Sequence, residues 1–145
     1  MADVKLKAGT PQVLEANGGS TANAAVGTAN DADFDNTTTL AMFADFELNA
    51  GFGSSVTAGE DLELYLVPKL DGTNAADVDT STPRFQPSHF AGMLITPTTE
   101  TAARRMTVSG VSVGPFKYTA YVWNRSGQTM SAGWTLTAYP VLVQN

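Results

Sequence analysis

Apolar and polar side chains alternate along two segments of the chain. The first is TTTLAMFADFELN, residues 37–49, and the second is DLELYLVP, residues 61–68. A period of two is the side-chain period of a β-strand with one buried face, so both segments predict strands, and we expect Pro68 to end the second. The apolar positions are Leu40, Met42, Ala44, Phe46 and Leu48 in the first segment, and Leu62, Leu64 and Leu66 in the second.

Shorter apolar segments extend this pattern. Residues 90–96, 104–113, 116–123 and 134–143 are separated by glycine and proline, and two pieces at 3–7 and 11–14 precede them; together they give about eight strands. No segment of helical spacing interrupts them, which argues against parallel βαβ units. The 19 threonines and the charged fraction of 15% suit a pleated sheet. The chain therefore predicts an all-β fold, a two-sheet antiparallel sandwich, with a jelly roll as the expected architecture.

Residues 15–35 differ from the rest of the chain. Val26 and Phe34 are their only large apolar residues, which is too few for a helix stripe or a strand face. We expect residues 1–35 to be an N-terminal arm and flexible loop. Residues 36–145 are expected to form the sandwich as a single domain.

Three further features bear on the connections. A polar segment of about twenty residues follows Pro68, and a loop of that length usually has a function or packs against something. YVWNRSGQTM, residues 121–130, predicts a hairpin or Greek-key corner that leads to Trp134. Pro140 lacks a donor for the strand ladder, so we expect a sheet edge or a bulge there.

Residues that support catalysis are scarce. The chain has no cysteine and one histidine, His89, and GFGSSVTAG does not fit the G-x-S-x-G nucleophile pattern. Asp61 and Glu63 are expected on the solvent face of their strand, where no apolar surroundings would raise a carboxyl pKa. The glycine motifs of nucleotide-binding loops are absent from the sequence. We therefore expect a protein that is not an enzyme and binds no cofactor.

Asp31, Asp33 and Asp35 have the spacing with which calcium loops present oxygen ligands. The pattern departs from that of an EF-hand, because Met42 stands where the bidentate glutamate should be. Residues 71–79 form a second acidic loop with the same ambiguity. We interpret both as solvated loops and expect no metal.

Charge and hydropathy argue against nucleic acid and membranes as partners. The formal net charge is −6, which disfavours binding to nucleic acid phosphates. No run of about 18 apolar residues would cross a bilayer, and the N-terminal residues lack the apolar stretch of a signal peptide. We expect a soluble protein made in a cytosol, with no membrane partner. The triplets at Asn36 and Asn124 match the N-glycosylation acceptor, a frequent chance match.

Several predicted strands carry large apolar side chains on both faces. An isolated sandwich alternates apolar and polar residues. Either a partner covers the second face, or bulges, the N-terminal arm and the long loops account for it. We favour a partner, since aromatic residues are frequent interface anchors, and we expect a homo-oligomer, a trimer in its expected form. The expected interface residues are Phe43, Tyr121, Trp123, Tyr139 and Val141.

The segments YVWNRSGQTMSAGWTLTAYP and DLELYLVPKLDGTNAADVD resemble small virion structural proteins of tailed bacteriophages, of the head decoration or cement type. The resemblance covers roughly residues 37–143. It implies a jelly roll or related sandwich, often a trimer, that sits on the outer capsid surface, binds the major capsid protein and stabilises the shell. The implied location is the virion, assembled in the host cytoplasm, and no catalytic residue comes with the resemblance.

Two alternatives remain open. A carbohydrate-binding, lectin-like module is the first, because jelly rolls often serve as lectins and Tyr65, Tyr121, Trp123 or Trp134 would be able to stack on sugar rings. A tail-associated virion protein is the second.

Overall fold

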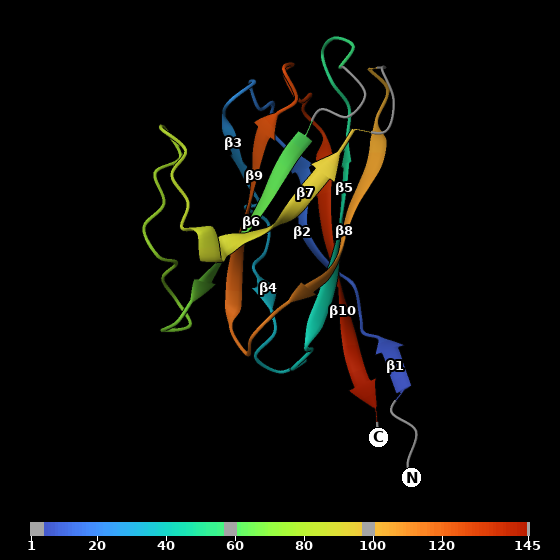
Figure 1. The fold of residues 1–145 in the computed structure, drawn as a ribbon, viewed down its shortest axis with the longest axis vertical. Helices are drawn as coiled ribbons and strands as arrows, with labels where there is room; N and C mark the ends of the chain where they lie inside the picture. The colour runs from blue at the N-terminus through green and yellow to red at the C-terminus, as the bar shows by residue number, and fades with distance from the viewer. Residues whose placement is uncertain (1–4, 57–60, 97–100, 145) are drawn as a thin grey trace.

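The protein is a sandwich of two antiparallel β-sheets (Figure 1). The computed structural model describes residues 5–56, 61–96 and 101–144. The predicted all-β sandwich is confirmed. In these residues, no helix is long and apolar enough to cross a membrane. The elements are β1 (Lys5–Ala8), β2 (Gln12–Gly18), β3 (Val26–Thr28), β4 (Phe34–Asp35), β5 (Phe43–Ala50), β6 (Asp61–Lys69), the 3-10 turn η1 (Pro87–His89), β7 (Phe90–Ile95), β8 (Arg104–Ser112), β9 (Lys117–Arg125) and β10 (Trp134–Gln144).

The strand order is that of a jelly roll. The first sheet has the order β1-β10-β5-β8, with β2 also paired to β10, and the second has β3-β9-β6-β7, with β4 also paired to β9. β1 and β2 pair with successive parts of β10, and β3 and β4 pair with successive parts of β9. Counting each of these pairs as one broken strand gives eight strand paths in the described chain, the number expected. Their pairings nest around the β6–β7 connection, as in one long hairpin rolled into a sandwich.

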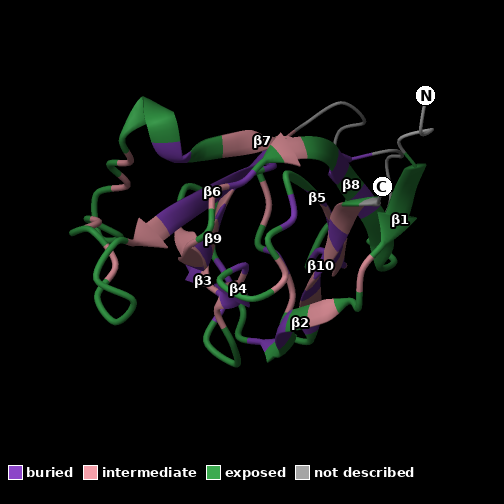
Figure 2. Cartoon of the chain, turned by 90° about the horizontal axis from the view of Figure 1, so that it is seen from below, coloured by how far each residue is buried: buried purple, intermediate pink, exposed green. Residues whose placement is uncertain are grey.

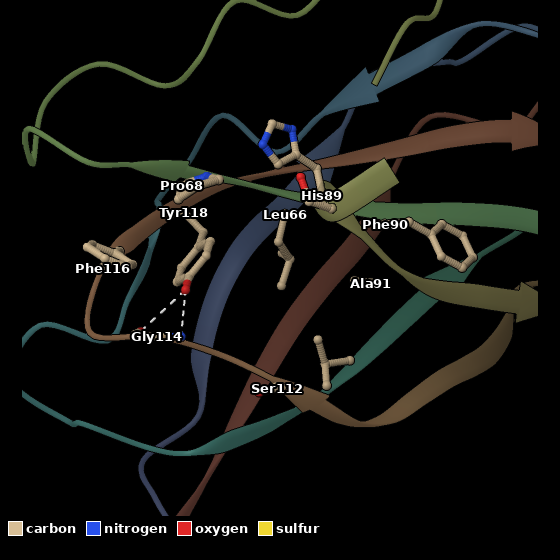
Figure 3. Close-up of a pocket in the computed structure, with 11 residues that line it drawn as sticks. Leu66, Pro68, His89, Phe90, Ala91, Ser112, Gly114, Phe116 and Tyr118 are labelled. Carbon is tan, nitrogen blue, oxygen red and sulfur yellow. Dashed lines mark hydrogen bonds between the residues drawn. The ribbon is translucent and has the colours of Figure 1, made fainter. Parts of the chain in front are cut away.

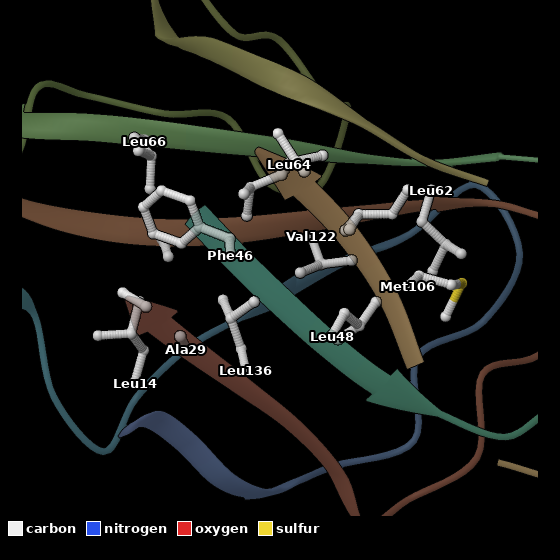
Figure 4. Close-up of a cluster of buried hydrophobic side chains, with 14 of the residues drawn as sticks. Leu14, Ala29, Phe46, Leu48, Leu62, Leu64, Leu66, Met106, Val122 and Leu136 are labelled. Atoms are coloured by element: carbon white, nitrogen blue, oxygen red, sulfur yellow. The ribbon is translucent and has the colours of Figure 1, made fainter. Parts of the chain in front are cut away.

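The core lies between the sheets and is filled from one side of each long strand (Figures 2 and 4). Phe46 packs edge-on against Phe34 at a ring-centroid distance of 5.6 Å. Alternation with a period of two is what a sandwich requires of each strand. The inward positions are Ala44, Phe46 and Leu48 on β5, Leu62, Leu64 and Leu66 on β6, Tyr118, Ala120 and Val122 on β9, and Trp134, Leu136 and Ala138 on β10, all buried.

The prediction that residues 15–35 form a flexible loop is wrong in part. β2 continues to Gly18, and β3 and β4 pair with β9. Phe34 of β4 is fully buried, and Ala29, directly after β3, is 5% exposed. These short strands are held by backbone pairing and close contact, so they need no run of large apolar residues. Residues 3 and 4 of the first predicted strand lie outside the described residues.

The first alternating segment begins later than predicted. β5 starts at Phe43, and Leu40 and Met42 are exposed before it. Leu40 has a φ of 51°, which belongs to the left-handed region and not to a strand. The inward stripe therefore begins at Ala44.

The predictions made for Pro68 and Pro140 are wrong. Pro68 does not end β6, because it still pairs with Tyr118 of β9. At that point the pairing of β6 with the edge strand β7 has already ended. Pro140 is on neither an edge nor a bulge: it lies opposite Ala44 of β5. On the other side of β10, the partner changes there from β2 to β1, and Gly9 donates to the Pro140 carbonyl at 2.7 Å. The missing donor falls at this break in the partner strand.

The predicted hairpin between residues 121–123 and Trp134 does not form. β9 belongs to the second sheet and β10 to the first. The turn between them therefore carries the chain across the sandwich, as the corner alternative allowed.

The indole ring of Trp134 packs directly against the backbone of Gly18 and Gly27. A Cβ at Gly18 would lie 2.0 Å from Cε2 of Trp134, and one at Gly27 would lie 3.0 Å from Cζ2. The indole N–H donates to the Gly19 carbonyl at 2.8 Å. The ring thus requires the absence of a side chain at Gly18.

We expect Gly18→Ala to lower the free energy of unfolding by about 1–3 kcal/mol or more, because the new methyl group overlaps the indole ring. Gly19→Ala is the matched control, since a Cβ there meets nothing within 4 Å, and its effect should stay within about 0.5 kcal/mol. Urea denaturation followed by tryptophan fluorescence measures both. Equal effects of the two substitutions would contradict this account of the Trp134 site.

Candidate interaction surface

The five predicted interface residues fall on two different faces. Phe43, Tyr139 and Val141 point outward from the first sheet, because their even-numbered neighbours on β5 and β10 point inward. Val141 lies directly opposite Phe43 in the register. Tyr121 and Trp123 belong to β9, so they lie on the outer face of the second sheet.

The pairing of β1 with β10 extends the apolar surface of the first sheet. Leu6 lies opposite Val143, and Ala8 lies opposite Val141. Leu6 is 69% exposed, Val143 42% and Phe43 38%. We call this contiguous surface the outer patch; its residues are Leu6, Ala8, Phe43, Tyr139, Val141 and Val143.

The outer patch ends on a two-stranded ribbon that projects from the sandwich (Figures 1 and 2). The pairing of β5 with β10 stops at Val141. Beyond it, residues 142–144 pair with β1 alone among the described residues, and all four residues of β1 are exposed. We call residues 5–8 and 141–144 the terminal ribbon. A free edge of this kind is a ready site for association.

Tyr121 and Trp123 are partly covered by the chain itself. Phe85, in the long loop after β6, stacks on Tyr65 at a centroid distance of 4.0 Å and lies 5.6 Å from the Tyr121 ring. The indole N–H of Trp123 donates to the Ala24 carbonyl at 3.2 Å. Cover by loops and by the N-terminal segment, the alternative left open above, accounts for part of the burial of these two residues.

Glu63 is buried, although the sequence pattern placed it on the solvent face. The Tyr65 hydroxyl donates to one of its carboxylate oxygens, and Arg125 pairs with the other. Burial and the bond to Glu63 raise the pKa of the Tyr65 phenol well above its usual range. The guanidinium of Arg125 also lies 5.2 Å from the centroid of the Trp123 ring, a distance at which the cation and the aromatic face attract each other.

The three aspartates with calcium-like spacing are directed to separate partners. Asp31 accepts a bond from the Ala16 amide at 2.7 Å, and Asp33 pairs with Lys69 at 2.8 Å. Asp35 pairs with Lys117 at 3.3 Å. Across residues 5–56, 61–96 and 101–144, no three His, Asp or Glu side chains gather in a way that would hold a metal ion.

Two buried asparagines fix the loops at the ends of the sandwich. Asn36 donates to the carbonyls of Ala41 and Gly114 at 2.9 and 2.8 Å. Asn124 donates to three carbonyls, those of Thr21, Ala22 and Gln128. Both side chains are fully buried, so neither glycosylation triplet presents an accessible acceptor in the folded protein.

An apolar hollow of about 280 Å³ opens beside η1 and the end of β8 (Figure 3). The side chains of Leu66 and Tyr118 point into it, and the Tyr118 hydroxyl accepts a bond from the Gly114 amide at 2.7 Å. A second hollow of about 380 Å³ adjoins it and shares Pro68 and His89. Sequence reasoning did not detect the apolar hollow, whose other apolar lining residues are Ala91, Val111 and Phe116.

His89 lies at the end of η1, between the two hollows. Its imidazole points away from the space that Leu66 and Tyr118 face (Figure 3), and the residue is buried. Burial lowers the pKa of the imidazole. A histidine that activates a serine, threonine or cysteine of the protein hydrogen-bonds to that hydroxyl or thiol, and His89 makes no such side-chain bond within the described part of the chain.

Comparison with models of known protein families and with curated proteins finds no match. The functional interpretation therefore depends on the fold and its surfaces.

Because His89 is the single histidine, its burial should be visible in the pH dependence of stability. Its folded pKa is lowered, so the unfolded chain takes up a proton at a higher pH than the folded one. We expect the free energy of unfolding to fall as the pH is lowered from about 6.5, until the folded pKa is reached. Urea denaturation between about pH 7.5 and 5.5 measures this slope, and His89→Gln should remove that part of it. An unchanged slope in the variant would refute the assignment.

Proposed function

We propose that the protein is a non-enzymatic virion structural protein, a capsid decoration or cement subunit that binds the outer capsid surface as an oligomer. The observation that carries the proposal is the outer patch, an apolar surface continuous through the register of β1, β10 and β5. Contiguous exposed apolar surface is typical of protein interfaces. The resemblance to decoration proteins that we infer from the sequence, over roughly residues 37–143, gives the proposal its specific form.

The physical properties of the sandwich suit a building block. Its loops are fixed by Asn36 and Asn124, and its projecting ribbon offers backbone and apolar side chains together. A subunit that binds only the assembled lattice shifts the assembly equilibrium toward that lattice by mass action. An oligomer, with the trimer as the expected form, strengthens weak single contacts through multivalency.

The carbohydrate-binding alternative has fewer free aromatic platforms than the sequence suggested. Trp134 is buried between the sheets, Tyr65 is stacked under Phe85, and Arg125 lies over the ring of Trp123. A sugar ring stacks on an open aromatic face. The tail-associated alternative uses the same surfaces, and electron microscopy of purified particles with and without the protein distinguishes head from tail.

The outer patch predicts self-association at micromolar concentration, measured as mass by light scattering. We expect the double substitution Phe43→Ser and Val143→Ser to shift the protein to monomer with little change in its melting temperature, because both side chains are substantially exposed. Met93→Ser is the control, since Met93 is 48% exposed on β7 of the other sheet. A monomeric parent protein, or equal masses for both variants, would count against the proposal.

A further inference from the structure

The molecule carries an apolar projection and an apolar hollow at separate places. The projection is the terminal ribbon, with Leu6 and Val143 opposite each other. The hollow is the one beside η1, between Leu66, Val111 and Phe116. We propose that the terminal ribbon of one copy docks in the apolar hollow of a second copy, head to tail. This inference rests on the proposed function and names a partner for the terminal ribbon, the end of the outer patch.

The size and character of the hollow fit an apolar side chain from the ribbon. An apolar cavity of about 150 Å³ in a protein is enough to bind benzene, and this hollow measures about 280 Å³. Ala91, Val111 and Phe116 line the hollow, are only partly buried and pack against the core. Leu6 is the more exposed residue of the ribbon pair, at 69%, and therefore the side chain with most to gain from burial.

The ribbon and the loop next to the apolar hollow carry opposite charges. The ribbon carries Lys5 and Lys7, both exposed, in a chain of net charge −6. The long loop beside the hollow, residues 70–86, holds three aspartates and one arginine. Among them, Asp71 lines the second hollow, which shares Pro68 and His89 with the first. Backbone amides of Asn74 and Thr73 lower the pKa of Asp71 to about 2, so it is ionised at neutral pH.

The geometry of this contact differs from that of a two-fold dimer. A two-fold interface joins the same patch on both copies, whereas a projection that enters a different surface makes a heterologous contact. In a closed assembly of such contacts, each copy has its ribbon docked in one neighbour and its hollow filled by the other. Rings of subunits are built from such contacts.

The absence of cysteine makes a clean cross-linking test available. One preparation carries Leu6→Cys in the ribbon and another carries Ser88→Cys, where Ser88 is exposed on the wall of the hollow. After mixing under mild oxidation, we expect the mixed disulfide to form at least about tenfold more than with Ala132→Cys. Ala132 is the matched control, exposed in the turn between β9 and β10. Gel electrophoresis and mass spectrometry measure the yields.

Three outcomes have distinct meanings. Equal yields with Ser88→Cys and Ala132→Cys overturn head-to-tail docking. Predominant Leu6→Cys homodimers also overturn it, since they indicate ribbons that meet across a two-fold axis. If the parent protein is a monomer by light scattering, the oligomeric form of the proposed function falls as well; if it is an oligomer and the cysteines fail to pair, only this inference falls.

A charge exchange tests the same contact without cysteine. We expect Lys5→Glu with Lys7→Glu to weaken self-association about tenfold, and Asp71→Lys added to that variant to restore part of the loss. Circular dichroism checks that each variant keeps the sandwich. Failure of the third substitution to restore any association, with the fold intact, would overturn the pairing of ribbon and loop.

Discussion

The pairing of β10 with three other strands holds the first sheet together. β5 lies along one side of β10, and β2 and then β1 lie along the other. The same strand sends Trp134, Leu136 and Ala138 into the core. Because β10 is both the centre of the sheet and a major wall of the core, the position of every other strand in that sheet depends on its register.

The long strands are predictable because each obeys one simple rule. The inward stripes of β5, β6, β9 and β10 follow the period of two in the sequence, and the sandwich follows from them. The short strands β3 and β4 are not predictable in this way. The buried residue of β3 is Gly27, which has no side chain to mark a strand face, and β4 has only two residues. The predictions for Pro68 and Pro140 were wrong because a proline is tolerated within a strand where the partner strand on one side is interrupted. Only the assembled sheet shows where such interruptions lie.

The candidate surface was predictable only in part, for a related reason. Phe43, Tyr139 and Val141 were identified from the parity of their strands, and they share one face. Tyr121 has the same parity signal, yet Phe85 of the long loop lies 5.6 Å from its ring. Strand periodicity carries no information on where a loop of that length folds back. Leu6 was missed as a surface residue because β1 gains its place only by pairing with the far end of the chain.

The adjacency of Lys5 and Gln144 in the register has a practical consequence for handling the protein. Chain that continues beyond Lys5 or Gln144 starts at the terminal ribbon, so a bulky tag joined there would shield the apolar strip and mask any assembly that depends on it. A short peptide that joins the two ends, with new ends opened in the long loop between β6 and η1, would give a circular permutant that leaves that strip unobstructed.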